Sequence, residues 1–145
     1  MNPRIKLSIA LLMAATVFRA QTVFFLPTIE SFGGISPDAW FGPWLADAVL
    51  GLLVPVMLYL FWFRRGLQLW GVLVAYNAIG VFDYSQGLIT QLFHPMPAEL
   101  ASPMLVYGGI GVCMLAQFIA LGLLTRREVA RYFADVSSWA RTNAA

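Results

Sequence analysis

Apolar residues dominate this chain in four long stretches, which are separated by short connections rich in polar residues, proline and glycine. The stretches cover Ile5–Leu26, Trp40–Phe63, Gly66–Phe93 and Pro103–Leu124. As α-helices rising ~1.5 Å per residue, each would cross the roughly 30 Å hydrocarbon core of a bilayer. The pattern therefore predicts an all-α protein in which residues 1–125 form a four-span transmembrane four-helix bundle.

The connections contain residues that start helices or form turns. Ser36-Pro37 and Ser102-Pro103 each predict a helix start, with the serine as N-cap and the proline at the first helical position. Gly33-Gly34 and Pro95–Pro97 mark the first and third connections as loops. These signals divide the chain at the same places as the apolar pattern does.

The last twenty residues or so differ in character from the rest. Thr125 and Glu128 have the spacing of a capping box at a helix start. Apolar side chains then recur at helical spacing, at Val129, Tyr132, Phe133, Val136 and Trp139. The pattern predicts that residues 126–145 are a cytoplasmic amphipathic tail, whose helix lies on the inner membrane surface. A frayed polar tail is the alternative.

The composition agrees with a membrane protein. Of the 145 residues, 60% are hydrophobic and only 11% are charged, whereas soluble proteins average roughly 45–50% and about 25%. So much apolar surface has no place in water, which makes the lipid bilayer the expected surroundings. A basic stripe with interleaved aromatic residues is missing, so a nucleic-acid partner is not expected.

The basic residues predict the orientation of the chain. Eight of nine precede the first stretch, separate the second from the third, or follow the fourth: Arg4, Lys6, Arg64, Arg65, Arg126, Arg127, Arg131 and Arg141. The first and third connections contain no lysine or arginine. By the positive-inside rule, this distribution places both termini on the cytoplasmic side of the membrane.

The first stretch has some features of a cleaved signal peptide, because basic residues precede its apolar run. However, Phe18 occupies a place where cleavage after Ala20 would need a small residue, and the apolar run continues to Leu26. We interpret this segment as a retained span.

Residues for common catalytic chemistry are scarce. The chain has one cysteine, Cys113, and one histidine, His94, so one chain can form neither a disulfide nor a bis-histidine haem site. The pattern contains no nucleophile–base pair, metal-ligand spacing or phosphate-binding loop. The sequence therefore favours a protein that is not an enzyme, and it identifies no cofactor.

The ninth basic residue, Arg19, lies inside the first apolar stretch, eight residues before Pro27 and hence about 12 Å from its outer end. Asp47 lies seven residues into the second stretch, at about 10 Å depth. Asp83 lies ten residues before Phe93, at about 15 Å. An arginine fork suits carboxylates, and unpaired charges are costly at this depth. We therefore expect these three residues to meet in the outer half of the bundle.

Two interpretations of this cluster stay open. Buried charge pairs can serve only to set helix register. Alternatively, two carboxylates against one cation need a proton, a cation or another donor, which is typical of an ion or ligand site. Polar neighbours extend the candidate pocket to Arg19, Asp47, Asn77, Asp83, Tyr84, Gln86 and Tyr107.

The same residues resemble a motif of uncharacterised bacterial multi-pass membrane proteins. The motif has an arginine in one span, Leu-Pro, a Pro-Trp-x-x-Asp run, and an asparagine six residues before an aspartate. Here the matching positions are Arg19, Leu26-Pro27, Pro43-Trp44 with Asp47, and Asn77 with Asp83. Leu45 and Ala46 replace glycines of the motif, and this chain has fewer spans. The resemblance implies that these polar residues belong together, and it implies no activity.

Two classes of function follow. The protein binds or translocates a small solute, ion or proton through an intramembrane polar pocket, or it is a non-catalytic accessory subunit of a larger membrane complex. A water-accessible cavity that reaches the charged residues would favour the first class. Charged residues buried without access to water, beside an exposed apolar groove, would favour the second. Four helices leave little room for a pathway in one protomer, so a homo-oligomer or a larger complex is expected.

Overall fold

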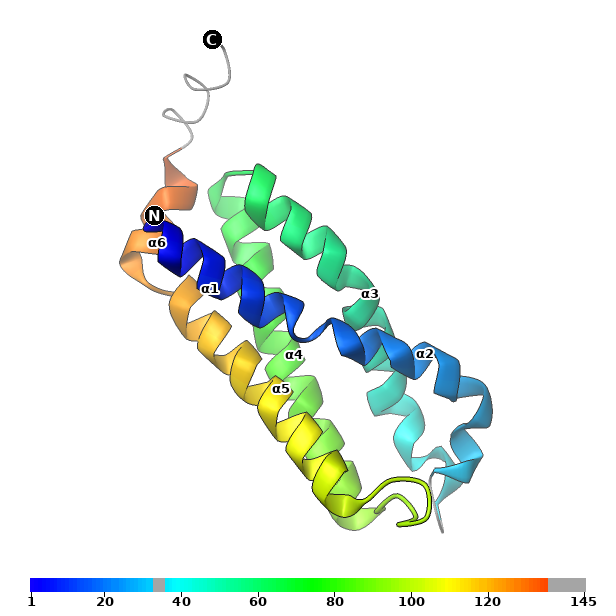
Figure 1. The fold of residues 1–145 in the computed structure, drawn as a ribbon. Helices are drawn as coiled ribbons and strands as arrows, with labels where there is room; N and C mark the ends of the chain where they lie inside the picture. Colours follow the sequence, from blue (N-terminus) through cyan, green and yellow to red (C-terminus); the bar gives the residue numbers. More distant parts are fainter. Residues whose placement is uncertain (33–35, 136–145) are drawn as a thin grey trace.

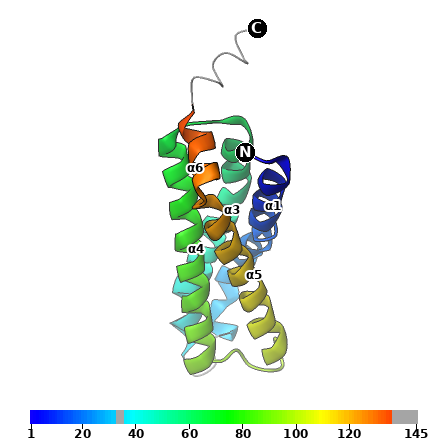
Figure 2. The same ribbon diagram turned by 90° about the vertical axis from the view of Figure 1, so that its left-hand side faces the viewer.

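The computed structural model describes residues 1–32 and 36–135, and within these ranges all regular elements are helical. Three long helices run lengthwise beside one another: α3 (Phe41–Phe63), α4 (Leu67–Phe93) and α5 (Pro103–Leu124) (Figures 1 and 2). The N-terminal segment packs against α3 and α5 and crosses the group obliquely. The described part of the chain therefore has three lengthwise helices and one oblique segment, at the four places where the apolar pattern predicts spans.

The N-terminal segment is not the single α-helix that its apolar run predicts. It consists of α1 (Pro3–Ala14), the 3₁₀ turns η1 (Val17–Gln21) and η2 (Leu26–Ser31), and the short helix α2 (Thr22–Phe25) between those turns. A further 3₁₀ turn, η3 (Pro37–Trp40), leads into α3. The α-helix therefore stops near the middle of the predicted span, just before Arg19.

Side-chain hydroxyls and a glycine explain why the break is tolerated. The Thr16 hydroxyl donates to the Met13 carbonyl at 2.7 Å. The Thr22 hydroxyl lies 2.8 Å from the carbonyl of Arg19 and 3.0 Å from that of Trp44 on α3. Gly51 of α3 lets the backbone of Ala20 approach so closely that a Cβ there would lie 2.6 Å from Ala20 Cα. Threonines and close packing thus compensate for lost helical hydrogen bonds at membrane depth.

The Thr22 hydroxyl gives a first prediction. Thr22→Val keeps the shape of the side chain but removes the donor between the broken segment and α3, so we expect a loss of about 1–2 kcal/mol in unfolding free energy. Thr28→Val is the matched control, because the Thr28 hydroxyl makes one exposed bond to the Phe25 carbonyl at 3.2 Å. Denaturation in mixed micelles would compare both variants. Equal losses would contradict the structural role of Thr22.

Three segments are long and apolar enough to cross a membrane, namely Pro3–Ser31, Asp38–Phe63 and Pro103–Leu124, which fits a membrane protein. Helix α4 has 27 residues but contains more polar side chains. Three of these polar side chains, Asn77, Asp83 and Gln91, are buried, whereas Gln68 and Gln86 are exposed. Its large apolar residues include many exposed ones, such as Phe82, Leu92 and Phe93. This distribution is the reverse of that on a soluble helix.

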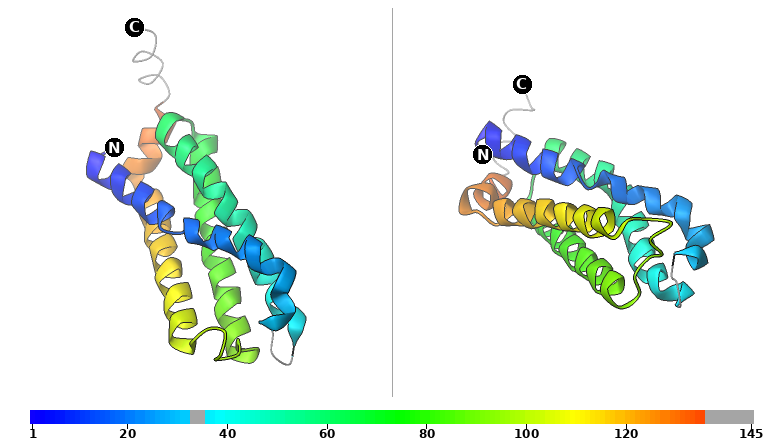
Figure 3. Two further views of the ribbon diagram at one scale, coloured as in Figure 1. Left: turned by 45° about the vertical axis from the view of Figure 1, so that its right-hand side comes forward. Right: turned by 60° about the horizontal axis from the view of Figure 1, so that its bottom comes forward.

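One end of the molecule carries most of the basic residues. Met1, the α3–α4 connection and α6 (Arg127–Ala134) gather there (Figures 1 and 2). The backbone N–H of Asn2 donates to Glu128 at 2.8 Å, and that of Gly66 donates to the Phe133 carbonyl at 3.0 Å. We call this the α6 end. The 94–102 connection and η2–η3 lie at the opposite end, the loop end (Figure 3).

Helix α6 differs from the predicted tail in two ways. The predicted capping box is wrong, because Arg126 is the N-cap and the Glu128 carboxylate bonds to Asn2 instead. The apolar side chains Val129 and Phe133 are fully buried against α4 and α5 rather than turned toward lipid. Predicted positions Val136 and Trp139 lie outside the described residues.

Two apolar clusters occupy the two ends of the interior. At the α6 end, buried residues from five helices form the larger one: Ile9, Met13, Leu50, Val54, Phe61, Leu73, Tyr76, Ala120, Leu124, Val129 and Phe133. At the loop end a smaller one contains Ile29, Trp40, Trp44 and Met96. Ser102 caps α5 as predicted, accepting from Leu105 N at 3.3 Å, whereas Ser36 precedes a 3₁₀ turn without a side-chain cap bond. The polar residues lie between the two clusters.

Candidate functional site

Arg19 lies at the break in the N-terminal segment and reaches all three long helices. Its Nε donates to Asp47 Oδ1 of α3 at 2.7 Å, and its Nη2 donates to Asp83 Oδ2 of α4. Its Nη1 donates to Gln117 Oε1 of α5 at 3.3 Å. The side chain is only 1% exposed. The guanidinium therefore uses its fork of donors entirely within the protein.

The two carboxylates meet at a single nitrogen. Asp47 Oδ1 lies 2.7 Å from Arg19 Nη2, and Asp83 Oδ2 pairs with the same atom. The Tyr84 ring covers one face of the guanidinium, with its centroid 4.2 Å from Arg19 Cζ, a cation–π contact that further holds the cation. With all three groups ionised, the cluster carries one excess negative charge.

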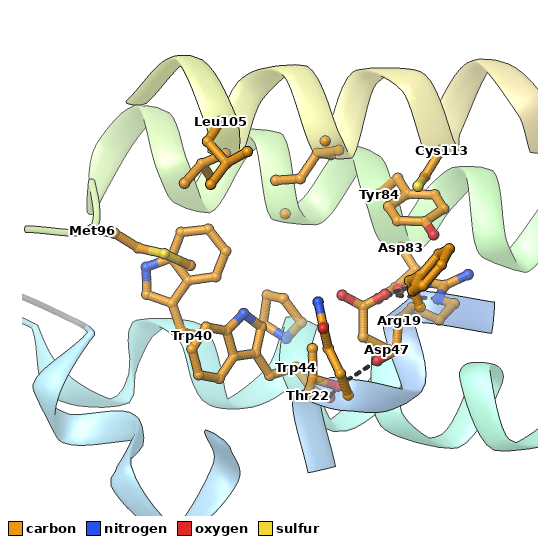
Figure 4. A pocket seen from close by; sticks show the side chains of 17 residues that line it. Arg19, Thr22, Trp40, Trp44, Asp47, Asp83, Tyr84, Met96, Leu105 and Cys113 are labelled. Atoms are coloured by element: carbon orange, nitrogen blue, oxygen red, sulfur yellow. Dashed lines mark hydrogen bonds and ion pairs between the residues drawn. The ribbon is translucent and has the colours of Figure 1, made fainter. Parts of the chain in front are cut away.

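A cavity of about 280 Å³ adjoins this cluster. Figure 4 shows Arg19, Asp47, Asp83 and Tyr84 at one end of it and Trp40, Met96 and Leu105 at the other. The lining comes from the N-terminal segment, α3, α4, α5 and the 94–102 connection: Phe18, Arg19, Gln21, Thr22, Trp40, Pro43, Trp44, Asp47, Asp83, Tyr84, Gly87, Met96, Leu105, Val106, Gly109, Ile110 and Cys113. Most of these side chains are apolar, and the charged ones lie at one end.

Helix periodicity explains how α3 contributes to the cavity. Trp44 lies four residues after Trp40, the N-cap of α3, and three residues before Asp47, so these side chains lie on one face, with Pro43 beside Trp44. Trp40 and Trp44 are buried, with ring centroids 6.0 Å apart. Trp40 Nε1 donates to the His94 carbonyl at 3.0 Å, which attaches the 94–102 connection to α3. The loop end of the cavity is closed by this apolar packing.

The mouth of the cavity faces sideways. Among its lining residues the exposed ones belong to two elements, Phe18 and Gln21 of the N-terminal segment and Leu105 and Gly109 of α5. Phe18 is 71% exposed and Leu105 is 70% exposed. The opening therefore lies between the N-terminal segment and α5, on the flank of the helices rather than at their ends.

Polar groups continue a short way below the cluster, toward the α6 end. Gln117 and Asn77 are fully buried, and Gln117 Nε2 and Asn77 Oδ1 have no hydrogen-bond partner among the described residues. Gly80 of α4 makes room for the Gln117 amide, since a Cβ there would overlap it. Beyond Asn77 the fully buried Leu73 belongs to the apolar cluster of the α6 end, so the polar path stops there.

The predicted pocket residues divide into three groups. Arg19, Asp47, Asp83 and Tyr84 line the cavity, and Asn77 is buried below it, outside the lining. Gln86 and Tyr107 are exposed and lie outside the lining, which corrects their assignment to the pocket.

Helix geometry gives the reason for both corrections. At about 100° per residue, Tyr84 and Gly87 lie on one side of Asp83 around α4, and Gln86 lies on the other. Tyr107 lies away from the α5 face formed by Val106, Ile110 and Cys113, and its hydroxyl donates to the Gln91 carbonyl at 3.3 Å.

Several site residues escaped the sequence reasoning. Gln117 is the only amide or charged side chain in α5. A single polar residue in an otherwise apolar helix could have indicated that Gln117 faces the interior. Trp44 and Trp40 share a helix face with Asp47, which was the available signal for their place in the cavity wall. Thr22 and Gly51 have no such signal, because their roles depend on contacts between the N-terminal segment and α3.

The site has few features of a metal centre. In residues 1–32 and 36–135, no three His, Cys, Asp or Glu side chains group as metal ligands. The chain matches no protein-family model, no curated protein and no solved structure. The geometry of the cavity and its charged residues is therefore what indicates the function.

Proposed function

We propose that this protein is a four-span membrane protein of the bacterial inner membrane that binds a small molecule in the cavity beside Arg19, Asp47 and Asp83. The observation that carries the proposal is the junction of a mostly apolar cavity with a buried cluster of one arginine and two carboxyl groups. Ligand sites typically combine an apolar wall with a few convergent polar groups. Ionisable residues at membrane depth are, in addition, unusual outside functional sites.

Two observations support the membrane arrangement. The inward polar and outward apolar residues of α4 favour a fourth span beside the three apolar ones. Basic residues from the N-terminus, the α3–α4 connection and α6 gather at the α6 end. By the positive-inside rule we place that end, with both termini, in the cytoplasm. The cavity then lies in the outer half of the bilayer.

The interior favours binding over free passage. The polar groups stop at Asn77, and a continuous apolar cluster fills the helices from there to the α6 end. A solute or proton bound at Asp83 would reach the cytoplasm only if α4 and α5 separated. Translocation therefore requires a second conformation, whereas binding requires only the cavity as it stands.

An accessory role is the second candidate, and one observation favours it. An apolar groove of about 350 Å³ lies between α1 and α3, lined by Ala10, Leu11, Ala14, Leu58, Tyr59, Trp62 and Phe63. Small residues at four-residue spacing, such as Ala10 and Ala14, permit close helix contacts within membranes. A second copy or a larger complex would then cover this groove.

The test fills the cavity without touching the charges. A Cβ at Gly109 meets no atom within 4 Å, and Gly109 lines the cavity, so Gly109→Leu should fold and displace the ligand. Gly111 also has free space at its Cβ but lies outside the lining, which makes Gly111→Leu the matched control. Native mass spectrometry of protein extracted gently from its own membrane would record bound molecules.

We expect wild type and Gly111→Leu to retain a small molecule at unit stoichiometry and Gly109→Leu to lose at least nine tenths of it. Retention by Gly109→Leu would contradict the proposed site. A stoichiometric protein partner, without any small molecule, would instead support the accessory role.

A further inference from the structure

The walls of the cavity indicate which ligand it would recognise. Asp47 is the charged group that faces it most openly, with its side chain 20% exposed, whereas Asp83 is 8% exposed and Arg19 only 1%. The arginine donors go to Asp47 Oδ1, and no N–H of the described residues reaches Asp47 Oδ2. A free carboxylate oxygen therefore faces the cavity, while the cation is withdrawn behind it.

This arrangement disfavours an anionic ligand. The Nε, Nη1 and Nη2 atoms of Arg19 already donate to Asp47, Gln117 and Asp83. The face of the guanidinium is covered by Tyr84. A carboxylate or phosphate group placed directly at Asp47 would be repelled.

A second polar group lines the same cavity without a partner. Tyr84 is 5% exposed, and its hydroxyl is buried without a hydrogen bond among the described residues. Figure 4 shows its ring between Cys113 and the Arg19–Asp83 pair. Its oxygen can accept a hydrogen bond, as the Asp47 oxygen can. Because the Tyr84 oxygen is enclosed, the accessible acceptor is the Asp47 carboxylate, which a positively charged group with several N–H donors would satisfy.

Apart from Gln21 and Thr22, the remaining lining is apolar, and the mouth opens on the flank between Phe18 and Leu105. In the proposed orientation this flank faces lipid, so a ligand with an apolar body can enter from the bilayer. The Trp40 and Trp44 rings form the wall along which such a body would lie.

We infer that the cavity binds an ammonium group carried on an apolar body, with the ammonium at Asp47 and the apolar part along Trp44 toward Trp40. This inference rests on the proposed binding function and adds the class of ligand. One ammonium also neutralises the excess negative charge of the cluster. The same chemistry is offered by a free lipophilic amine and by the headgroup of an aminophospholipid.

The test compares three probes that have the same eight-carbon alkyl chain and different polar head groups. Octylammonium, octanol and octanoate are titrated at pH 7 into the protein in phosphatidylcholine nanodiscs, with calorimetry of empty discs subtracted. We expect octylammonium to bind at least tenfold more tightly than octanol, and octanoate more weakly than both. Octanoate binding as tightly as octylammonium would overturn the inference.

Variants separate this inference from the proposed function. Asp47→Asn leaves a balanced Arg19–Asp83 pair, and it should remove the tenfold advantage of octylammonium over octanol. Asp38→Asn is the control, because Asp38 is exposed and outside the lining, and it should retain the advantage. An advantage that persists in Asp47→Asn overturns the ammonium site.

Gly109→Leu completes the set. If Gly109→Leu abolishes octanol binding while wild type binds octylammonium no more tightly than octanol, the ammonium inference is wrong but the cavity does bind ligands. If Gly109→Leu changes the binding of none of the probes, the ammonium inference and the proposed binding function are both wrong. Phosphatidylethanolamine is then added to the discs. Weaker octylammonium binding indicates competition and supports a lipid headgroup as the natural ligand of the site, whereas unchanged binding supports a free amine as that ligand.

Discussion

Replacing Arg19 by leucine is expected to lower the unfolding free energy by about 3–5 kcal/mol, because it leaves two carboxylates buried without their cation. Asp47 and Asp83 both pair with Arg19 Nη2, and Gln117 would lose its donor as well. Arg19→Lys keeps the charge but loses the fork, so an intermediate loss is expected. Thermal unfolding in detergent, followed by size-exclusion chromatography, would measure both variants.

Removal of the carboxylates supplies the control. The triple variant Arg19→Leu, Asp47→Asn, Asp83→Asn contains no charge in the cluster, and it should recover at least half of the loss. Replacing partners together is generally far less harmful than leaving one charge unpaired. A triple variant as unstable as Arg19→Leu alone would contradict an energetic coupling among the three residues.

Gly51→Ala is the second substitution for which we expect a large effect, about 3 kcal/mol or more of lost stability. The new Cβ would lie 2.6 Å from Ala20 Cα and 2.8 Å from Arg19 Cγ. The Ala20 contact is with backbone, which cannot rotate away. The broken segment would have to move from α3 and draw Arg19 away from Asp47.

Gly42→Ala on the same helix is the matched control, because nothing lies within 4 Å of its Cβ. Alanine is the better helix former, so this change should be neutral or stabilising by up to about 1 kcal/mol. Chemical denaturation in micelles would compare the pair. If Gly51→Ala were as stable as Gly42→Ala, the close approach of Ala20 to α3 would be wrong.

Local pattern was enough to predict the helical class and the limits of the three long helices. Apolar runs and capping residues depend only on neighbours along the chain, so α3, α4 and α5 begin and end close to their predicted limits. The depth of a residue within a span also follows from the sequence alone, because a helix rises by a fixed distance per residue. For this reason Arg19, Asp47 and Asp83 could be placed at one level before any contact was known.

The rotation of each side chain around its helix was harder to predict. Gln86 and Tyr107 have the depth of the site but lie away from the cavity, whereas Trp44 and Gln117 face the interior. Apolar residues cover nearly the whole circumference of these helices, so periodicity does not distinguish the lipid-facing side from the interior. Contacts between helices make that distinction.

Composition and periodicity, then, are sufficient for a membrane protein of four helical segments with charges at one depth. The break before Arg19 depends on the Thr22 bond to Trp44 and on the space at Gly51, which are contacts between distant parts of the chain. The same contacts withdraw Arg19 behind Asp47 and leave a carboxylate facing the cavity. The sign of the charge offered to a ligand is therefore a property of packing, because pairing inside the protein decides which charges remain accessible.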